Sequence, residues 1–302
     1  MNDKTLTYTP YDGSSKPFTI GLLQLDPARW IEPDGDLAYH LAEKMRLFAE
    51  HGDRVFRTEP GTEDAQREIL DALVDYLPSH HPAIYRRAGN VMEMAGQRVG
   101  LSDDALPPLL RAGLLVQDDL VVMRKGEKGW RLAAAFLAFP SSWSLSEKFG
   151  KVMDEIHAPV PDFEGGSRNA GLISRMFDNL PPDRFVVRWN WSVNWGYRLY
   201  RPASQPASET KDIPPEEAFI RVERQTLRKM PVSGDILFTI RIYLDPVTAI
   251  MGQPNAPELA ASLADQLEAL NPAQTDYKGL SAKRAELVAL LRKSADACVT
   301  VE

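Results

Sequence analysis

The sequence predicts an α+β fold in which a small antiparallel sheet carries helices on one face. Between residues 114 and 247 the apolar patterns follow the order strand, strand, helix, helix, strand, strand, strand. Strands and helices do not alternate one by one, as they would in a doubly wound sheet. Hydrophobic residues make up 44% of the 302 residues and charged residues 25%, which is typical of a globular protein.

Residues 1–100 are expected to form an N-terminal loop and helical extension packed on the core. The first 36 residues are rich in proline, aspartate and glycine, which indicates loop. A second helix follows Thr62, a suitable N-cap, and ends at "LPSHHP". The first helix is indicated by apolar residues at helical spacing, namely Leu37, Leu41, Met45 and Phe48.

Residues 101–250 are expected to form the core, and residues 251–302 a pair of C-terminal helices. Two strands joined by the turn "KGEKG" open the core. The predicted strands cover residues 114–126, 129–143, 185–200, 217–230 and 235–247, and the predicted helices residues 145–157 and 169–180. The C-terminal stripe consists of Leu259, Leu263, Leu267 and Leu270, followed by a helix near 281–293.

Bulk properties exclude several functions. A net charge of −7 argues against binding to nucleic acid or to an anionic membrane. The single cysteine, Cys298, excludes an internal disulfide and a cysteine-ligated iron–sulfur cluster within this chain. No signal peptide, apolar run of membrane-spanning length, P-loop or dinucleotide-binding motif is present, so we expect a cytoplasmic protein without its own nucleotide cofactor.

The predicted helix over residues 145–157 has clear boundaries. Ser144 and Glu147 have the spacing of a capping box, which places the first helical residue at Leu145. The sequence "HAPVP" then stops the helix, because two prolines force an extended chain.

His157 ends this helix and, at helical spacing, shares the apolar face of Phe149 and Met153. One interpretation is a histidine at a helix C-terminus, where the dipole favours a positive ring. The other is axial ligation of a haem iron, which needs only one imidazole, whereas zinc needs three or four ligands. The helical pattern alone leaves both open.

Two strand segments carry polar residues in alternation. In "RVERQTLRK" (221–229) neither face is cleanly apolar, which indicates either an edge strand with cross-strand ion pairs or the wall of a pocket. In "VVRWNWSVNWGYRLY" (186–200) Arg188 and Asn190 alternate with tryptophans. The aromatic face predicts core packing, and the polar face either binds an acidic group or lies in solvent.

Four segments together resemble a known family. They are "GLLQLDPARWIEPD", "FPSSWSLSEKFGKVMDEIHAPVP", "RWNWS" and "RVERQTLRKMPVSGDILFTIRIYL". In this order, over roughly residues 20 to 250, they resemble the haem-dependent oxidative N-demethylase alpha-subunit-like family. The resemblance implies a PAS-like fold that binds haem b, similar to haem-binding gas sensors.

The resemblance also implies roles for particular residues. His157, the only histidine after residue 82, would be the axial ligand of the iron. The distal, catalytic side would come from Glu223, Arg224 and Gln225, although strand alternation keeps all three from facing one pocket unless the strand is bulged. The cofactor would be bound in addition by Arg168, Arg175, Arg188 and Asn190, the arginines being suited to the haem propionates.

The activity implied by the resemblance is oxidative N-demethylation of a small secondary amine, such as dimethylamine, with O2. Electrons would come from partner subunits that carry flavin, an iron–sulfur cluster and NADPH, because this chain has no motif for them. A haem-binding sensor or carrier without turnover is an alternative with the same fold. A structural protein without haem is a third.

Overall fold

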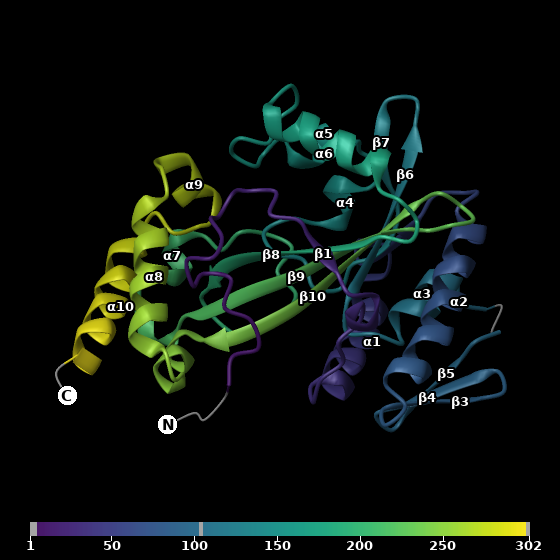
Figure 1. The fold of residues 1–302 in the computed structure, drawn as a ribbon, viewed down its shortest axis with the longest axis horizontal. Helices are drawn as coiled ribbons and strands as arrows, with labels where there is room; N and C mark the ends of the chain where they lie inside the picture. The colour runs from purple at the N-terminus through teal and green to yellow at the C-terminus, as the bar shows by residue number, and fades with distance from the viewer. Residues whose placement is uncertain (1–4, 103–104, 300–302) are drawn as a thin grey trace.

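The computed structural model describes residues 5–102 and 105–299, and its centre is a seven-stranded sheet (Figure 1). The strand order is β1-β8-β9-β10-β6-β7-β2, and every neighbouring pair is antiparallel. The expected α+β class with an antiparallel sheet is confirmed. The five long strands are β6 (Asp119–Gly126), β7 (Gly129–Phe136), β8 (Phe185–Asn194), β9 (Phe219–Lys229) and β10 (Ile236–Pro246).

The N-terminal third contributes more strands than expected. The edges of the main sheet are β1 (Leu23–Leu25), beside β8, and β2 (Phe56–Thr58), beside β7. A separate three-stranded sheet contains β3 (Tyr85–Ala88), β4 (Val91–Met94) and β5 (Gln97–Gly100). Strands of three or four residues are too short for a period-two pattern to be recognised, so the sequence did not indicate these strands beside the two helices.

The helices surround the sheet, and α2 begins after Thr62, as predicted. The longer helices are α1 (Leu37–His51), α2 (Glu63–His80), α6 (Arg168–Asn179), α8 (Ala256–Ala269) and α10 (Arg284–Val299). The shorter ones are α3 (Pro108–Gly113), α4 (Leu145–Lys148), α5 (Met153–His157), α7 (Ala207–Thr210) and α9 (Pro272–Tyr277). Among the residues that the structure describes, no helix is long and apolar enough to cross a membrane.

Helices cover both faces of the sheet: α4–α6 lie on one face, and α2 and α8, which belong to the N- and C-terminal extensions, lie on the other together with α3. We call the two sides the α6 face and the α8 face. On the α6 face, Leu227 and Ile240 belong to one core with Phe177 of α6. On the α8 face, α2 and α3 pack at one end, and α8 packs at the other against Trp191 and Val222. A sheet whose strands are apolar on both faces needs cover on both.

The predicted helix over 145–157 is interrupted. It forms α4, with the predicted capping box between Ser144 and Glu147, and a separate α5. Between them the Gly150 N–H donates to the Leu132 carbonyl (2.9 Å), and the Leu132 N–H donates to the Lys151 carbonyl (3.1 Å). These bonds to β7 replace the helical ones, and Gly150 turns the chain with a φ of 77°. The expectation that Phe149 shares a helical face with His157 was therefore wrong.

Gly113, at the end of α3, is in close contact with the core. A Cβ added there would lie 2.3 Å from Cδ1 of the buried Phe136. Gly171, inside α6, has no atom within 4 Å of an added Cβ. We expect Gly113→Ala to lower the free energy of unfolding by about 1–3 kcal/mol through overpacking. We expect Gly171→Ala, the matched control, to raise it by up to about 1 kcal/mol through helix propensity.

Urea unfolding of both variants tests this pair of expectations. Equal effects of the two substitutions would contradict the close packing of α3 on β7.

Candidate functional site

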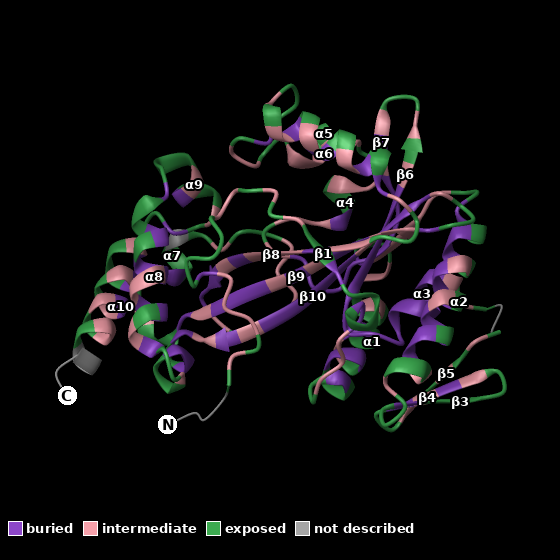
Figure 2. Cartoon of the chain, viewed as in Figure 1, coloured by how far each residue is buried: buried purple, intermediate pink, exposed green. Residues whose placement is uncertain are grey.

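The α6 face carries a polar cluster on its two central neighbouring strands. Arg188 and Asn190 of β8 lie opposite Gln225 and Glu223 of β9, respectively. All four side chains are half-buried, whereas most residues that β8, β9 and β10 place on the α8 face are buried. We call these four residues the β8–β9 polar cluster. Figure 2 shows the central strands as buried or intermediate, with exposed residues gathered on the outer elements.

The carboxylate of Glu223 organises this cluster. Gln225 Nε2 donates to Glu223 Oε2 over 2.9 Å, and Asn190 Nδ2 lies 3.5 Å from the same oxygen. Arg221 Nε donates to Glu223 Oε1 over 3.2 Å. The Arg221 side chain is 1% exposed and that of Glu223 is 13% exposed, so this ion pair lies largely out of water. The carboxylate is thus held in one orientation at the edge of the interior.

Arg224, expected on the distal side with Glu223 and Gln225, is not part of this cluster and points to the opposite face of the sheet. The registers of β9 with β8 and β10 run from Phe219 to Lys229 without a shift, and no bulge turns Arg224 to the side of Glu223. Arg224 is buried on the α8 face, where it donates to the carbonyls of Arg29 and Trp30 and pairs with Glu32. It anchors the N-terminal segment to the sheet.

β9 lies inside the sheet between β8 and β10, so the interpretation of "RVERQTLRK" as an edge strand was also wrong. The charged residues of β9 therefore do not lie at a solvent-exposed edge of the sheet. The remaining interpretation is that the strand forms the wall of a pocket, and the half-buried positions of Glu223 and Gln225 agree with it.

The C-terminal extension contributes two side chains that the sequence did not indicate. Lys278, just after α9, donates from Nζ to the Trp191 carbonyl over 2.6 Å. Its ammonium lies 5.1 Å from the ring centroid of Phe18 and 4.6 Å from that of Trp191. Burial lowers the pKa of Lys278 to about 8, against the opposing effect of Glu223. The neighbouring Tyr277 packs on Phe18, with ring centroids 5.8 Å apart.

Charge effects place Tyr277 and Lys278 beside the β8–β9 polar cluster. Burial raises the pKa of Tyr277, with a further contribution from Glu223 that Arg188 opposes. The same two charges act on Lys278. No periodic pattern indicated this pair, because it lies at the end of a helix of only six residues; the local "DYKG" is the only signal, and it is weak.

His157 is half-buried at the last position of α5. Burial, together with the positive charges of Arg188 and Lys148, lowers its pKa to about 4. A hydrogen bond to the Met153 backbone opposes this shift. The imidazole is therefore neutral at physiological pH, which is the state in which a ring nitrogen can bind a metal ion.

Arg188 connects His157 with the cluster. Its Nη2 donates to the Thr19 carbonyl over 3.1 Å, and its Nε is buried with no hydrogen-bond partner among the described residues. Burial lowers the pKa of this guanidinium, while the charge of Glu223 raises it. A buried arginine donor without a partner is costly, and an anionic ligand would satisfy it.

Arg168 and Arg175 lie elsewhere. Both are on α6 with exposed side chains, and within the described part of the chain neither makes a hydrogen bond or ion pair through its guanidinium. The structure does not bring them together with His157.

An apolar layer lies around the α6 face and stays partly exposed although it belongs to the largest core. From the helical layer it includes Phe149, Met153, Ile156, Val160 and Met176; from the sheet Val186, Phe238 and Leu244; and from the N-terminal segment Phe18, Ile20 and Leu22. Incompletely buried apolar side chains next to a neutral imidazole and an unpartnered arginine suit a flat apolar group with acidic substituents. These residues therefore fit a haem.

No three His, Cys, Asp or Glu side chains converge on a metal-binding point within residues 5–102 and 105–299.

A family model described as "Haem-dependent oxidative N-demethylase, alpha subunit-like" matches residues 21–288 of the chain. The match includes α5, the whole β8–β9 polar cluster and the Tyr277–Lys278 pair.

The lowered pKa of His157 has a consequence for stability. Between its ordinary pKa of 6.5 and about 4, the folded state binds fewer protons than the unfolded state. The resulting stabilisation is fully present above pH 6.5 and is lost as the pH falls towards 4. We expect His157→Gln to flatten the pH dependence of the free energy of unfolding across this interval, measured by urea titration of the haem-free protein. Identical slopes for the two proteins would contradict the desolvated state of His157.

Proposed function

The chain belongs to the haem-dependent oxidative N-demethylase alpha-subunit-like family, and on this premise we propose that it is the haem-binding oxygenase component of an oxidative N-demethylase. Its substrates would be a small secondary amine, such as dimethylamine, and O2. The core from β6 to β10, with α4–α6 between its second and third strands, supports a PAS-like assignment for the haem-binding fold.

The observation that carries this proposal is the environment of His157. A neutral imidazole flanked by partly exposed apolar side chains is suited to bind the iron of haem b as an axial ligand. Arg188 would bind a propionate through its unpartnered Nε, together with Asn190 two residues further along the strand. Arg168 and Arg175 stay candidates for propionate contacts from the solvent side.

Bound haem would supply the oxygen chemistry of the reaction. The residues of the chain would bind and orient the amine. Glu223 accepts hydrogen bonds from Arg221 and Gln225, and a carboxylate has about four lone-pair sites, so it can still accept an N–H of an ammonium. Gln225 and Arg221 keep the carboxylate in place during this contact. Lys278, with its pKa near 8, is a proton source beside the same group.

The family is named for an alpha subunit, which implies partner subunits. We propose that they carry the flavin, the iron–sulfur cluster and the NADPH site of the electron supply. This chain has one cysteine and cannot ligate such a cluster alone.

Haem reconstitution tests the role of His157. We expect the wild-type protein to bind haem b and show a Soret band, and His157→Ala to lose that band or shift it, because the axial nitrogen is removed. His80→Ala, an exposed histidine at the end of α2, is the matched control and should retain the wild-type spectrum. An unchanged spectrum for His157→Ala would reject the ligand, and a wild-type protein that stays colourless with haem would reject the proposal.

The amine site is tested through Glu223 in the haem-loaded protein. We expect Glu223→Gln to weaken dimethylammonium binding by about 10- to 150-fold, corresponding to a charge-assisted hydrogen bond of about 1.5–3 kcal/mol. Difference spectra provide the measurement, and Glu217→Gln, which is exposed, is the control. Equal binding by both variants would reject Glu223 as the anchor. A haem-loaded wild type without response to any methylated amine would favour a sensor or carrier.

A further inference from the structure

Lys278 lies beside the β8–β9 polar cluster with fewer partners than a desolvated ammonium usually has. An ammonium carries three N–H donors, and the structure gives Lys278 Nζ one acceptor, the Trp191 carbonyl at 2.6 Å. The ring centroids of Phe18 and Trp191, 5.1 Å and 4.6 Å away, add cation–π attraction. Within the described part of the chain Lys278 forms no ion pair, and the carboxylate of Glu223 is paired with Arg221 instead.

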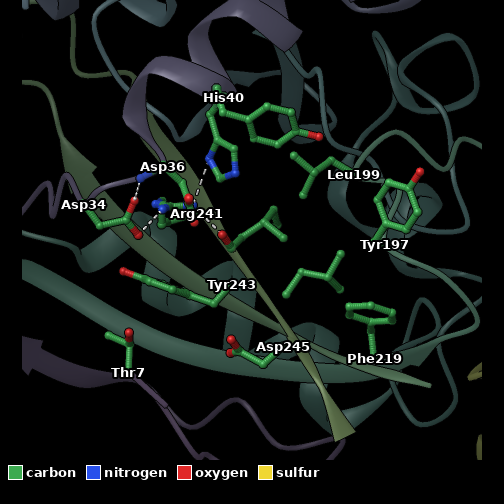
Figure 3. A pocket seen from close by; sticks show the side chains of 13 residues that line it. Thr7, Asp34, Asp36, His40, Tyr197, Leu199, Phe219, Arg241, Tyr243 and Asp245 are labelled. Atoms are coloured by element: carbon green, nitrogen blue, oxygen red, sulfur yellow. Dashed lines mark hydrogen bonds and ion pairs between the residues drawn. The ribbon is translucent and has the colours of Figure 1, made fainter. Parts of the chain in front are cut away.

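Other cations of the interior have direct partners. On the α8 face, the guanidinium of Arg241 pairs with Asp34 over 2.5 Å (Figure 3). Lys44 of α1 donates to three backbone carbonyls, at 2.9 Å, 3.0 Å and 2.5 Å. A charge that is taken out of water needs such partners to stay charged. Lys278 has one carbonyl and two rings, so its charged state depends on charges that it does not contact.

Two charged side chains act on Lys278, one from each neighbouring strand of the cluster. The carboxylate of Glu223 on β9 favours the ammonium, and the guanidinium of Arg188 on β8 disfavours it. The N-terminal segment contributes Phe18, which is uncharged, and the neighbouring Tyr277 is neutral because its pKa is raised. Burial outweighs Glu223, so the pKa of Lys278 is lowered to about 8. Glu223 is the negative charge that helps Lys278 to keep its proton.

A cation bound to Glu223 would remove this support. Alkylammonium groups such as that of lysine ionise at about pH 10, so a dimethylammonium ion is protonated at pH 7. Bound to Glu223, it would neutralise the carboxylate and add a second positive charge near Lys278. Before the amine arrives, a propionate on Arg188 would cancel the repulsion from that guanidinium, so Lys278 of the haem-loaded protein would carry its proton at pH 7.

We propose that Lys278 is the proton-exchanging residue of the amine site, and that it releases a proton to solvent when an ammonium substrate binds to Glu223. The inference rests on the proposed function. An N–H bond of Lys278 breaks, its electron pair stays on Nζ, and the proton passes to water, so no oxidant or reductant takes part. The neutral amine can still donate to the Trp191 carbonyl. Charge is thereby conserved in the site, because one cation replaces another.

Calorimetric titration of the haem-loaded full chain with dimethylammonium tests this inference. The binding enthalpy at pH 7 is measured in phosphate and in MOPS, two buffers with different enthalpies of ionisation, and the difference counts the protons released. We expect the wild type to release between about half a proton and one proton per amine bound, and Lys278→Met to release none. Methionine retains an apolar stem beside the two rings.

The pH dependence of the affinity is a second measurement, which a merely structural role of Lys278 would not change. At one pH unit below a pKa of about 8, protonated lysine outnumbers neutral lysine by about tenfold. We therefore expect Lys278→Met to bind dimethylammonium up to about tenfold more tightly than the wild type at pH 7, and equally at pH 9. Lys211→Met, at a lysine that is 67% exposed, is the matched control and should behave as the wild type.

The proposal is overturned if the wild type releases no proton, if Lys278→Met releases one, or if the wild type binds the amine at pH 7 at least as tightly as Lys278→Met. Glu223→Gln separates these outcomes from failure of the proposed function. If the wild type does not bind dimethylammonium, or binds it no better than Glu223→Gln, the amine site itself is rejected, and the role of Lys278 with it.

Discussion

The register of β9 is the constraint on which the site depends. β9 is hydrogen-bonded to β8 on one side and to β10 on the other without a shift over its whole length. Because successive side chains point to opposite faces, this register sends Glu223 and Gln225 to the α6 face and Arg224 to the α8 face. A slip by one residue would exchange them, burying the carboxylate where Arg224 now holds the N-terminal segment.

The two faces have different roles because they are covered differently. The α8 face is covered by α2, α3 and α8, and its buried Arg224 donates to two backbone carbonyls and pairs with Glu32. The α6 face is covered by α4, α5 and α6 and by the N-terminal segment, and several of its apolar side chains stay partly exposed. The side chains of His157 and Lys278 on that face are removed from water, and this burial lowers the pKa of both. Such a setting suits a bound cofactor.

Sequence patterns predicted what depends on local periodicity. The five long strands, α6 and the alternation of Arg188 and Asn190 with tryptophans were all recognised. The interruption between α4 and α5 was not, because it results from backbone hydrogen bonds to Leu132, far away in the sequence. The Tyr277–Lys278 pair was missed for a similar reason, since only the folded chain brings α9 to Trp191. The burial of charged residues in β9 was also not predicted, because it results from the central position of this strand in the sheet.

The central claim is that His157 and the α6 face together form a haem site. A crystal structure of the haem-loaded protein tests it most directly. We expect the axial nitrogen to come from His157 and the porphyrin to lie against the α6 face, with a propionate on Arg188. A porphyrin bound elsewhere, or an iron ligated by any other residue, would contradict the account.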